Sequence, residues 1–137
     1  MMGSSRLRLV ALATALTTAI VLLANIAADL ALAQRPFENG HVGFIDALDV
    51  AILHFIFTGL PFFALAGCGE QRRTYWITAV SLTLVSWTYA VWQIWHDSLT
   101  GFAGGANIGL GLIMMAAPMV IAVVITAASL VSKPPAA

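Results

Sequence analysis

Residues 108–130 read IGLGLIMMAAPMVIAVVITAASL and contain no charged side chain. A helix needs about 20 apolar residues, at about 1.5 Å each, to cross a hydrocarbon layer of about 30 Å. This stretch meets that requirement, and residues 9–29, 48–66 and 76–95 meet it as well. We therefore expect an all-α integral membrane protein whose four transmembrane helices form a compact antiparallel bundle.

The composition of the chain leads to the same expectation. Of the 137 residues, 61% are hydrophobic and only 9% are charged, whereas an average soluble domain is roughly half apolar and a quarter charged. The segments between the four stretches are short, so residues 1–137 are expected to form a single membrane domain. A formal net charge of zero argues against a nucleic-acid partner, because phosphate binding needs a basic face. The first expected partner is the lipid bilayer.

Positive charges predict how the spans are oriented, because Lys and Arg in short loops stay on the cytoplasmic side. Four spans place the N-terminus, the loop after the second span and the C-terminus on one side of the membrane. The basic residues of that side are Arg6, Arg8, Arg72, Arg73 and Lys133. The opposite side carries only Arg35. We therefore predict a location in the cell (inner) membrane, with both termini in the cytoplasm.

The first span also has a second interpretation, which the sequence leaves open. Arg6 and Arg8, the apolar stretch after them and then Ala31-Leu32-Ala33 resemble a secretory signal with a small-x-small cleavage site. Cleavage after Ala33 would leave three spans and place the new N-terminus outside. The length of the apolar stretch and the charge of Asp29 near the site favour retention of the span.

Polar side chains inside a bilayer are costly, so each one marks a candidate site. The candidates are Asn25 and Asp29 on the first span, His54 on the second, and Tyr89, Gln93 and His96 along one stripe of the third. We expect Asn25, His54, Tyr89 and Gln93 to meet in the bundle interior, with Asp29 and His96 nearer the headgroups. Such a cluster is either an outward-facing pocket for a ligand, proton or ion, or a set of interhelical hydrogen bonds that fixes helix rotation.

Glycine and proline predict how the spans pack. Gly101, Gly105 and Gly109 repeat every four residues, a spacing that lets helix backbones approach closely, although a flexible loop is the alternative for the first two. Pro61 and Pro118 lie inside the second and fourth spans. Each lacks an N–H and clashes with the carbonyl four residues earlier, so kinks are expected at both.

The sequence predicts no catalytic, metal or cofactor site. Its serines have no neighbouring His and acid at the spacing of a nucleophilic motif, and the single Cys68 excludes an internal disulfide or a CxxC motif. His54 has no second intramembrane histidine to share a haem with, and no HxxxH or HxxE pair places two metal ligands on one helical face. An enzyme is therefore not favoured.

Two hypotheses about function follow from these patterns. The first is a structural or interaction protein that packs as a homo-oligomer, or as an accessory subunit of a membrane complex, through the glycine face of the fourth span. The alternative is a small transporter or ligand-binding membrane protein with an outward-facing polar pocket around His54. The near-absence of charge inside the spans suits the first hypothesis, and the polar side chains around His54 suit the second.

Overall fold

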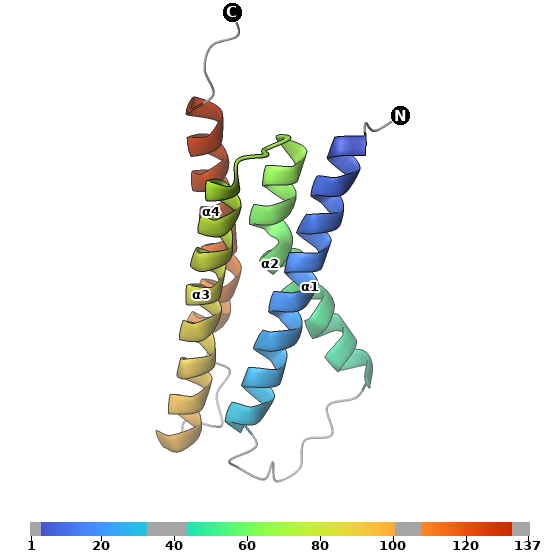
Figure 1. The fold of residues 1–137 in the computed structure, drawn as a ribbon. Coiled ribbons are helices and arrows are strands. Elements are labelled where there is room, and N and C mark those ends of the chain that lie inside the picture. Colours follow the sequence, from blue (N-terminus) through green and yellow to red (C-terminus); the bar gives the residue numbers. More distant parts are fainter. Residues whose placement is uncertain (1–3, 33–43, 101–107, 133–137) are drawn as a thin grey trace, which may run out of the picture.

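The computed structural model describes residues 4–32, 44–100 and 108–132. Its helices are α1 (Ser4–Leu32), α2 (Phe44–Gly67), α3 (Arg73–Thr100) and α4 (Ile108–Val131). Successive helices run in opposite directions, so the start of α1 and the end of α4 lie at the same end of the bundle (Figure 1). The described part of the chain contains no strand, and the expected all-helical fold is confirmed.

Three of the helices are long and apolar enough to cross a membrane. The segments that meet this condition are Ser4–Ala28 of α1, Arg73–Asp97 of α3 and Gly109–Val131 of α4. Helix α2 contributes a shorter apolar stretch, Ala51–Gly67. Helices of this length and composition are compatible with a membrane location, because about 20 apolar residues span the hydrocarbon layer.

Each helix turns a narrow stripe of residues toward the others. The buried stripes are Ala13, Thr17, Ile20 and Ala24 on α1, and Trp76, Ala79, Thr83, Trp87 and Ala90 on α3. Steps of three and four residues keep such side chains on one face of a helix. Large aliphatic residues such as Leu23, Val85 and Val123 are more than half exposed on the outer faces. Large apolar side chains on the outer faces suit a lipid solvent, in which burying such a side chain gains little.

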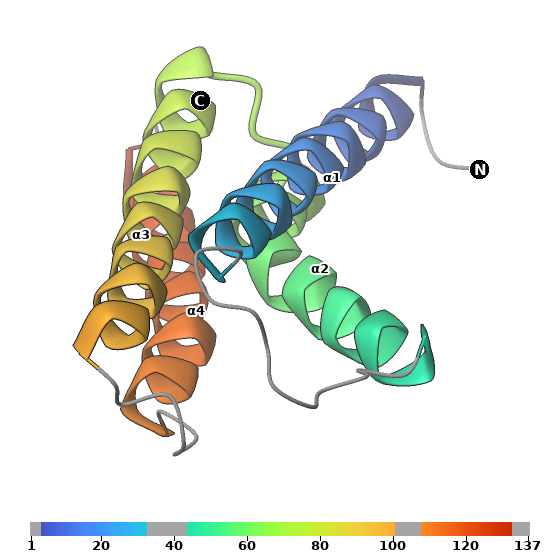
Figure 2. The same cartoon turned by 90° about the horizontal axis from the view of Figure 1, so that it is seen from below.

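The helices pack as a ring in the order α1, α2, α4, α3, since α1 contacts α2 and α3 while α4 contacts the same two from the other side (Figure 2). Gly59 of α2 marks a close approach to α1. A Cβ atom built at Gly59 would lie 3.3 Å from Thr17 Cγ2, and 2.8 Å from the ring of Phe63. Glycine at this position therefore lets α2 pack closely against the small-residue stripe of α1.

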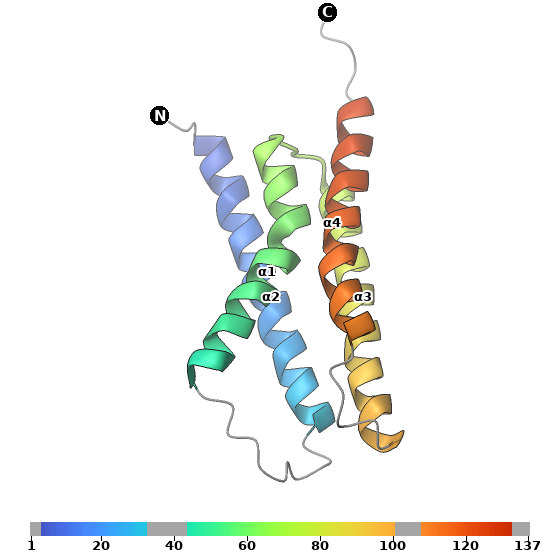
Figure 3. The same ribbon diagram turned by 180° about the vertical axis from the view of Figure 1, so that it is seen from behind.

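Helix α2 bends partway along its length, and its N-terminal half leans away from α4 (Figure 3). Pro61 lies inside this helix. Proline has no N–H to donate to the carbonyl of Phe57, and its ring pushes that carbonyl away, which bends the helix on the N-terminal side of the proline. Pro118 lies inside α4, and its side chain is buried. The bend in α2 separates a half that packs tightly from a half that diverges.

Candidate functional site: a pocket beside His54

A hydrogen bond joins two of the residues expected to meet. Nδ1 of His54 on α2 lies 3.3 Å from Oδ1 of Asn25 on α1. The amide nitrogen of Asn25 donates to the carbonyl of Val21, one turn earlier in α1, at 2.7 Å. Both side chains of the pair are partly buried. The contact ties α2 to α1 in the N-terminal, diverging half of α2.

On the other side of α2, the ring of His54 contacts α3. It meets Trp87 edge to face, with ring centroids 5.0 Å apart and an angle of 84° between the planes. The indole N–H of Trp87 donates to the hydroxyl of Thr58, one turn after His54, at 3.0 Å. Trp87 and Thr58 are both buried. The three side chains fix how α2 and α3 face each other, because each aromatic edge and polar atom has a defined partner.

Next to this group lies a pocket of about 230 Å³ between α2, α3 and α4. Helix α2 contributes Leu53, His54, Phe57 and Thr58; α3 contributes Thr83, Ser86, Trp87 and Ala90; α4 contributes Gly111, Met114, Met115 and Pro118. The lining is apolar except for His54 and the small hydroxyl side chains. An apolar cavity of roughly 150 Å³ holds a benzene molecule. This pocket is therefore large enough for a molecule somewhat bigger than a single ring.

Thr83 stands out among the hydroxyl residues at the pocket. Its side chain is buried, and its Oγ1 has no hydrogen-bond partner. Ser86, also at the pocket, donates to the carbonyl of Leu82 at 3.0 Å. Other helical threonines satisfy their hydroxyls in the same way; Thr78, for example, donates to the carbonyl of Thr74 at 2.9 Å. A buried hydroxyl without a partner carries a desolvation cost of about 1–3 kcal/mol.

The other sequence-predicted residues of the third span lie away from the His54–Asn25 contact. Tyr89 is 44% exposed and packs against the ring of Trp92, with centroids 6.0 Å apart. Gln93 donates to Asp97 at 3.3 Å on the same helix. His96 contacts Trp92 with centroids 5.5 Å apart, and its Nδ1 lies 3.7 Å from Asp97. These residues form a local cluster near the C-terminal end of α3.

Some of the predicted residues lie outside the described part of the structure. Gly101 and Gly105 fall between α3 and α4, outside the described residues, and the side chain of Asp29 is likewise not described. Gly109 lies at the start of α4 and is exposed.

Sequence reasoning missed the α3 and α4 walls of the pocket. No role was predicted from the sequence for Trp87, Met114 or Met115, which line the pocket on α3 and α4. A signal was nevertheless present in Ser86-Trp87, a hydroxyl and an indole in the middle of a span. Both groups need hydrogen-bond partners when they are buried.

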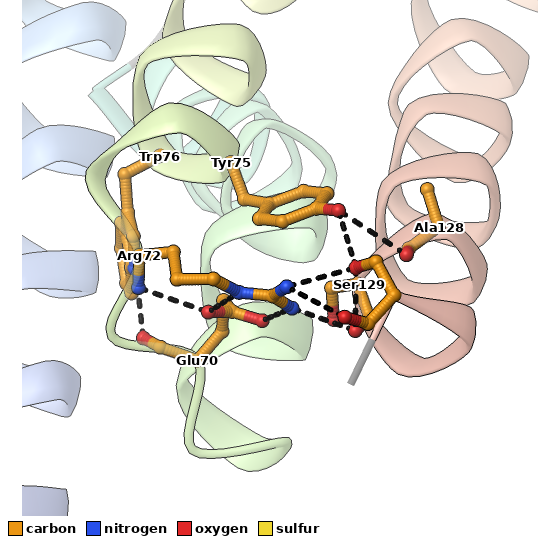
Figure 4. Close-up of polar contacts among 7 residues, drawn as sticks. Glu70, Arg72, Tyr75, Trp76, Ala128 and Ser129 are labelled. Carbon is orange, nitrogen blue, oxygen red and sulfur yellow. Dashed lines mark hydrogen bonds and ion pairs between the residues drawn. The ribbon is translucent and has the colours of Figure 1, made fainter. Parts of the chain in front are cut away.

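A second polar cluster lies at the opposite end of the bundle, in the turn between α2 and α3 (Figure 4). The guanidinium of Arg72 donates to both carboxylate oxygens of Glu70, through Nε at 2.8 Å and Nη2 at 2.6 Å. It also reaches α4, where it donates to the carbonyl of Ser129 at 2.7 Å and to the hydroxyl of Ser132 at 2.9 Å. Arg72 thereby supplies donors to carbonyls that the end of α4 leaves without helical partners.

Two aromatic residues hold this cluster in place. The indole N–H of Trp76 donates to the backbone carbonyl of Glu70 at 2.9 Å. The hydroxyl of Tyr75 lies 2.6 Å from that of Ser132, and its ring lies under the guanidinium of Arg72, 4.5 Å from ring centroid to Cζ. We call Glu70, Arg72, Tyr75 and Ser132 the turn clamp. It connects the α2–α3 turn to the end of α4.

The clamp changes the acid–base behaviour of its carboxylate. Hydrogen bonds from the side chain of Arg72 are the main reason that the pKa of Glu70 falls from an ordinary 4.5 to about 2, against the opposing effect of burial. The Glu70 side chain is only 2% exposed. A carboxylate so buried remains ionised because a guanidinium binds it with two parallel hydrogen bonds.

Within the described residues, no group of three or more His, Cys, Asp or Glu side chains lies close enough to hold a metal ion. No protein-family model, curated protein sequence or solved structure matches the chain.

Proposed function

We propose that this chain is a four-span membrane protein that binds a small lipid-soluble molecule in the pocket beside His54. The observation that carries the proposal is the pocket of about 230 Å³, with an imidazole and hydroxyl side chains set in an apolar wall. Ligand sites are typically concave and mostly apolar, with a few polar groups that orient the bound molecule. In this role the protein is a carrier, sensor or transporter of its ligand.

The four-span topology rests on two arguments. Helix α2 runs from Phe44 to Gly67, and its 24 residues at about 1.5 Å each exceed the hydrocarbon thickness of about 30 Å. Helix α1 carries Asn25, the partner of His54, and packs closely on Gly59. Removal of α1 as a signal peptide would expose this face of α2, so we propose that α1 is retained, with both termini in the cytoplasm as the arginines suggest.

Filling the pocket tests the proposal. Gly111 lines the pocket, and a Cβ atom at this position would meet nothing within 4 Å. The variant Gly111→Phe therefore adds its Cβ atom without a clash and places a ring at the wall of the pocket. In lipid nanodiscs, the wild-type protein is expected to bind 1-naphthol saturably in isothermal titration calorimetry. The Gly111→Phe protein should show only the linear partitioning of naphthol into lipid.

The matched control is Leu112→Phe, which adds the same ring at the neighbouring position. Leu112 is 62% exposed and does not line the pocket. This control should bind naphthol like the wild type. Identical, non-saturating titrations for all three proteins would contradict the proposal. A pocket that is already filled by a lipid acyl chain, and therefore takes up no naphthol, would contradict it as well.

The interaction hypothesis remains as a second candidate. It is favoured by the exposure of Gly109 and Gly111 on α4, where a second helix could approach the backbone closely. In this case Gly111→Phe would reduce the mass of the particle in mild detergent, measured by light scattering. Under the ligand-binding proposal the same variant keeps the wild-type mass.

A further inference from the structure

The orientation of Asn25 decides which nitrogen of His54 carries a proton. The carbonyl of Val21 can only accept, so the group of Asn25 that faces it at 2.7 Å is the NH₂. The amide oxygen of Asn25 then faces His54, and this oxygen can only accept. Nδ1 of His54, 3.3 Å away, must therefore be the donor.

This assignment leaves the second ring nitrogen of His54 with a lone pair. In a neutral imidazole one nitrogen donates and the other accepts, so a protonated Nδ1 makes Nε2 an acceptor. Among the residues that the structure describes, Nδ1 has Asn25 as its partner, and Nε2 has no hydrogen-bond partner. The indole N–H of Trp87 on α3, whose ring contacts that of His54, is already used by Thr58.

The rest of the pocket selects the body of the ligand. Phe57, Met114 and Met115 provide an aromatic face and two thioethers, and the indole of Trp87 closes one side. Thioether sulfur and aromatic faces pack favourably against aromatic rings. A volume of about 230 Å³ accommodates one ring or two fused rings.

We infer that the ligand is an aromatic or cyclic alcohol, such as a phenol, whose hydroxyl donates to Nε2 of His54 while its ring lies between Phe57 and the two methionines. This inference rests on the proposed function, because it assigns a ligand class to the same pocket. Asn25 acts as a positioning residue: it holds His54 in the tautomer that accepts.

Two probes of equal shape test the assignment. 1-Naphthol carries a hydroxyl donor, and 1-methoxynaphthalene has the same rings with no donor. After correction for partitioning, measured with the Gly111→Phe protein in the same nanodiscs, wild-type protein should bind naphthol about three- to tenfold more tightly than the ether, as expected for the net contribution of one hydrogen bond.

Variants of the two polar residues separate this role from simple packing. His54→Phe retains a ring but loses the acceptor, so both probes should bind with equal affinity. Asn25→Leu keeps His54 but removes the acceptor that holds the proton on Nδ1, so the preference for naphthol over the ether should decrease. Nitrogen NMR of the ligand-free wild type, which needs no variant, should show Nδ1 of His54 protonated and Nε2 unprotonated.

The results of these experiments test the alcohol assignment separately from the proposed function. Saturable binding of both probes with equal affinity to the wild type would overturn the alcohol assignment and leave the pocket as a binding site. A protonated Nε2 in the NMR spectrum would overturn it too. Absence of saturable binding for either probe, matching the Gly111→Phe protein, would overturn the proposed function itself.

Discussion

At the residue scale, single polar atoms decide what each end of this bundle can do. His54 has one ring nitrogen hydrogen-bonded to α1 and its ring perpendicular to that of Trp87, so it is held in place while its second nitrogen can still accept a hydrogen bond. Glu70 is the opposite case, since Arg72 binds both of its carboxylate oxygens and the backbone N–H of Arg72 donates to one of them. His54 is therefore suited to binding a further group, and Glu70 to stabilising the fold.

The low pKa of Glu70 predicts a pH dependence of stability. Since the folded-state pKa of about 2 lies below the ordinary 4.5, the ionised carboxylate stabilises the fold fully above pH 4.5. This contribution is lost as the pH falls from about 4.5 to about 2. The stability difference between wild type and Glu70→Gln, measured by thermal unfolding in detergent, should therefore be constant above pH 5 and shrink toward pH 2.

Arg73→Gln is the matched control, because Arg73 follows Arg72 directly and its side chain is exposed. This variant should lose stability in parallel with the wild type as the pH falls. A Glu70→Gln difference that stays unchanged down to pH 2 would show that the carboxylate does not stabilise the turn clamp.

At the element scale, Pro61 divides α2 into two halves with different tasks. The C-terminal half packs tightly through Phe62 and Leu65, both fully buried, and leads to the turn clamp. The N-terminal half carries Leu53, His54 and Phe57, which line the pocket. Because the N-terminal half leans away from α4 (Figure 3), the bend determines how far apart the α2 and α4 walls of the pocket stand.

The variant Pro61→Ala tests this division. Alanine restores the hydrogen bond to the carbonyl of Phe57 and removes the ring clash, so α2 should straighten. Spin labels at Ile52 and Ile113, both partly exposed, should then lie closer together by electron paramagnetic resonance in a Cys68→Ala background. Naphthol binding should weaken several-fold, as the pocket narrows.

Pro36→Ala provides the control, since position 36 precedes α2 in the sequence and its replacement should change neither the spin-label distance nor the binding. An unchanged distance in Pro61→Ala would mean that packing, rather than the proline, bends α2.

At the scale of the whole molecule, the antiparallel order of the helices gives the bundle two ends, which we call its faces toward the two sides of the membrane. Arg6 and Arg8 at the start of α1, the α2–α3 turn and the end of α4 share one face (Figure 1). The turn clamp lies at this face, and the diverging half of α2 points to the other. The proposed topology puts the basic face in the cytoplasm, in line with the distribution of arginines.

Cysteine labelling tests that topology. In a Cys68→Ala background, Gly104→Cys between α3 and α4 should react with a membrane-impermeant maleimide in intact cells. Gln71→Cys, in the exposed part of the α2–α3 turn, should react only after the membrane is permeabilised. The opposite pattern would invert the orientation, and equal labelling of both in intact cells would contradict four crossings. An N-terminal tag that disappears from the mature protein would show that α1 is cleaved.

The positions of the helices could be predicted from the sequence, because long uncharged stretches such as residues 108–130 permit little else than a helix in an apolar solvent. The sequence also placed Asn25 and His54 at similar depth, since depth follows from helical rise along each span. The rotation of each helix about its own axis, by which Trp87 faces His54 while Tyr89 is exposed, became clear from the folded bundle alone. In lipid, the inward and outward faces of a span are both apolar, so the rotation of a helix depends on its contacts with other helices. Examples are the contact of Gly59 with Thr17 and that of Arg72 with the end of α4. Such contacts cannot be predicted from the sequence of one span.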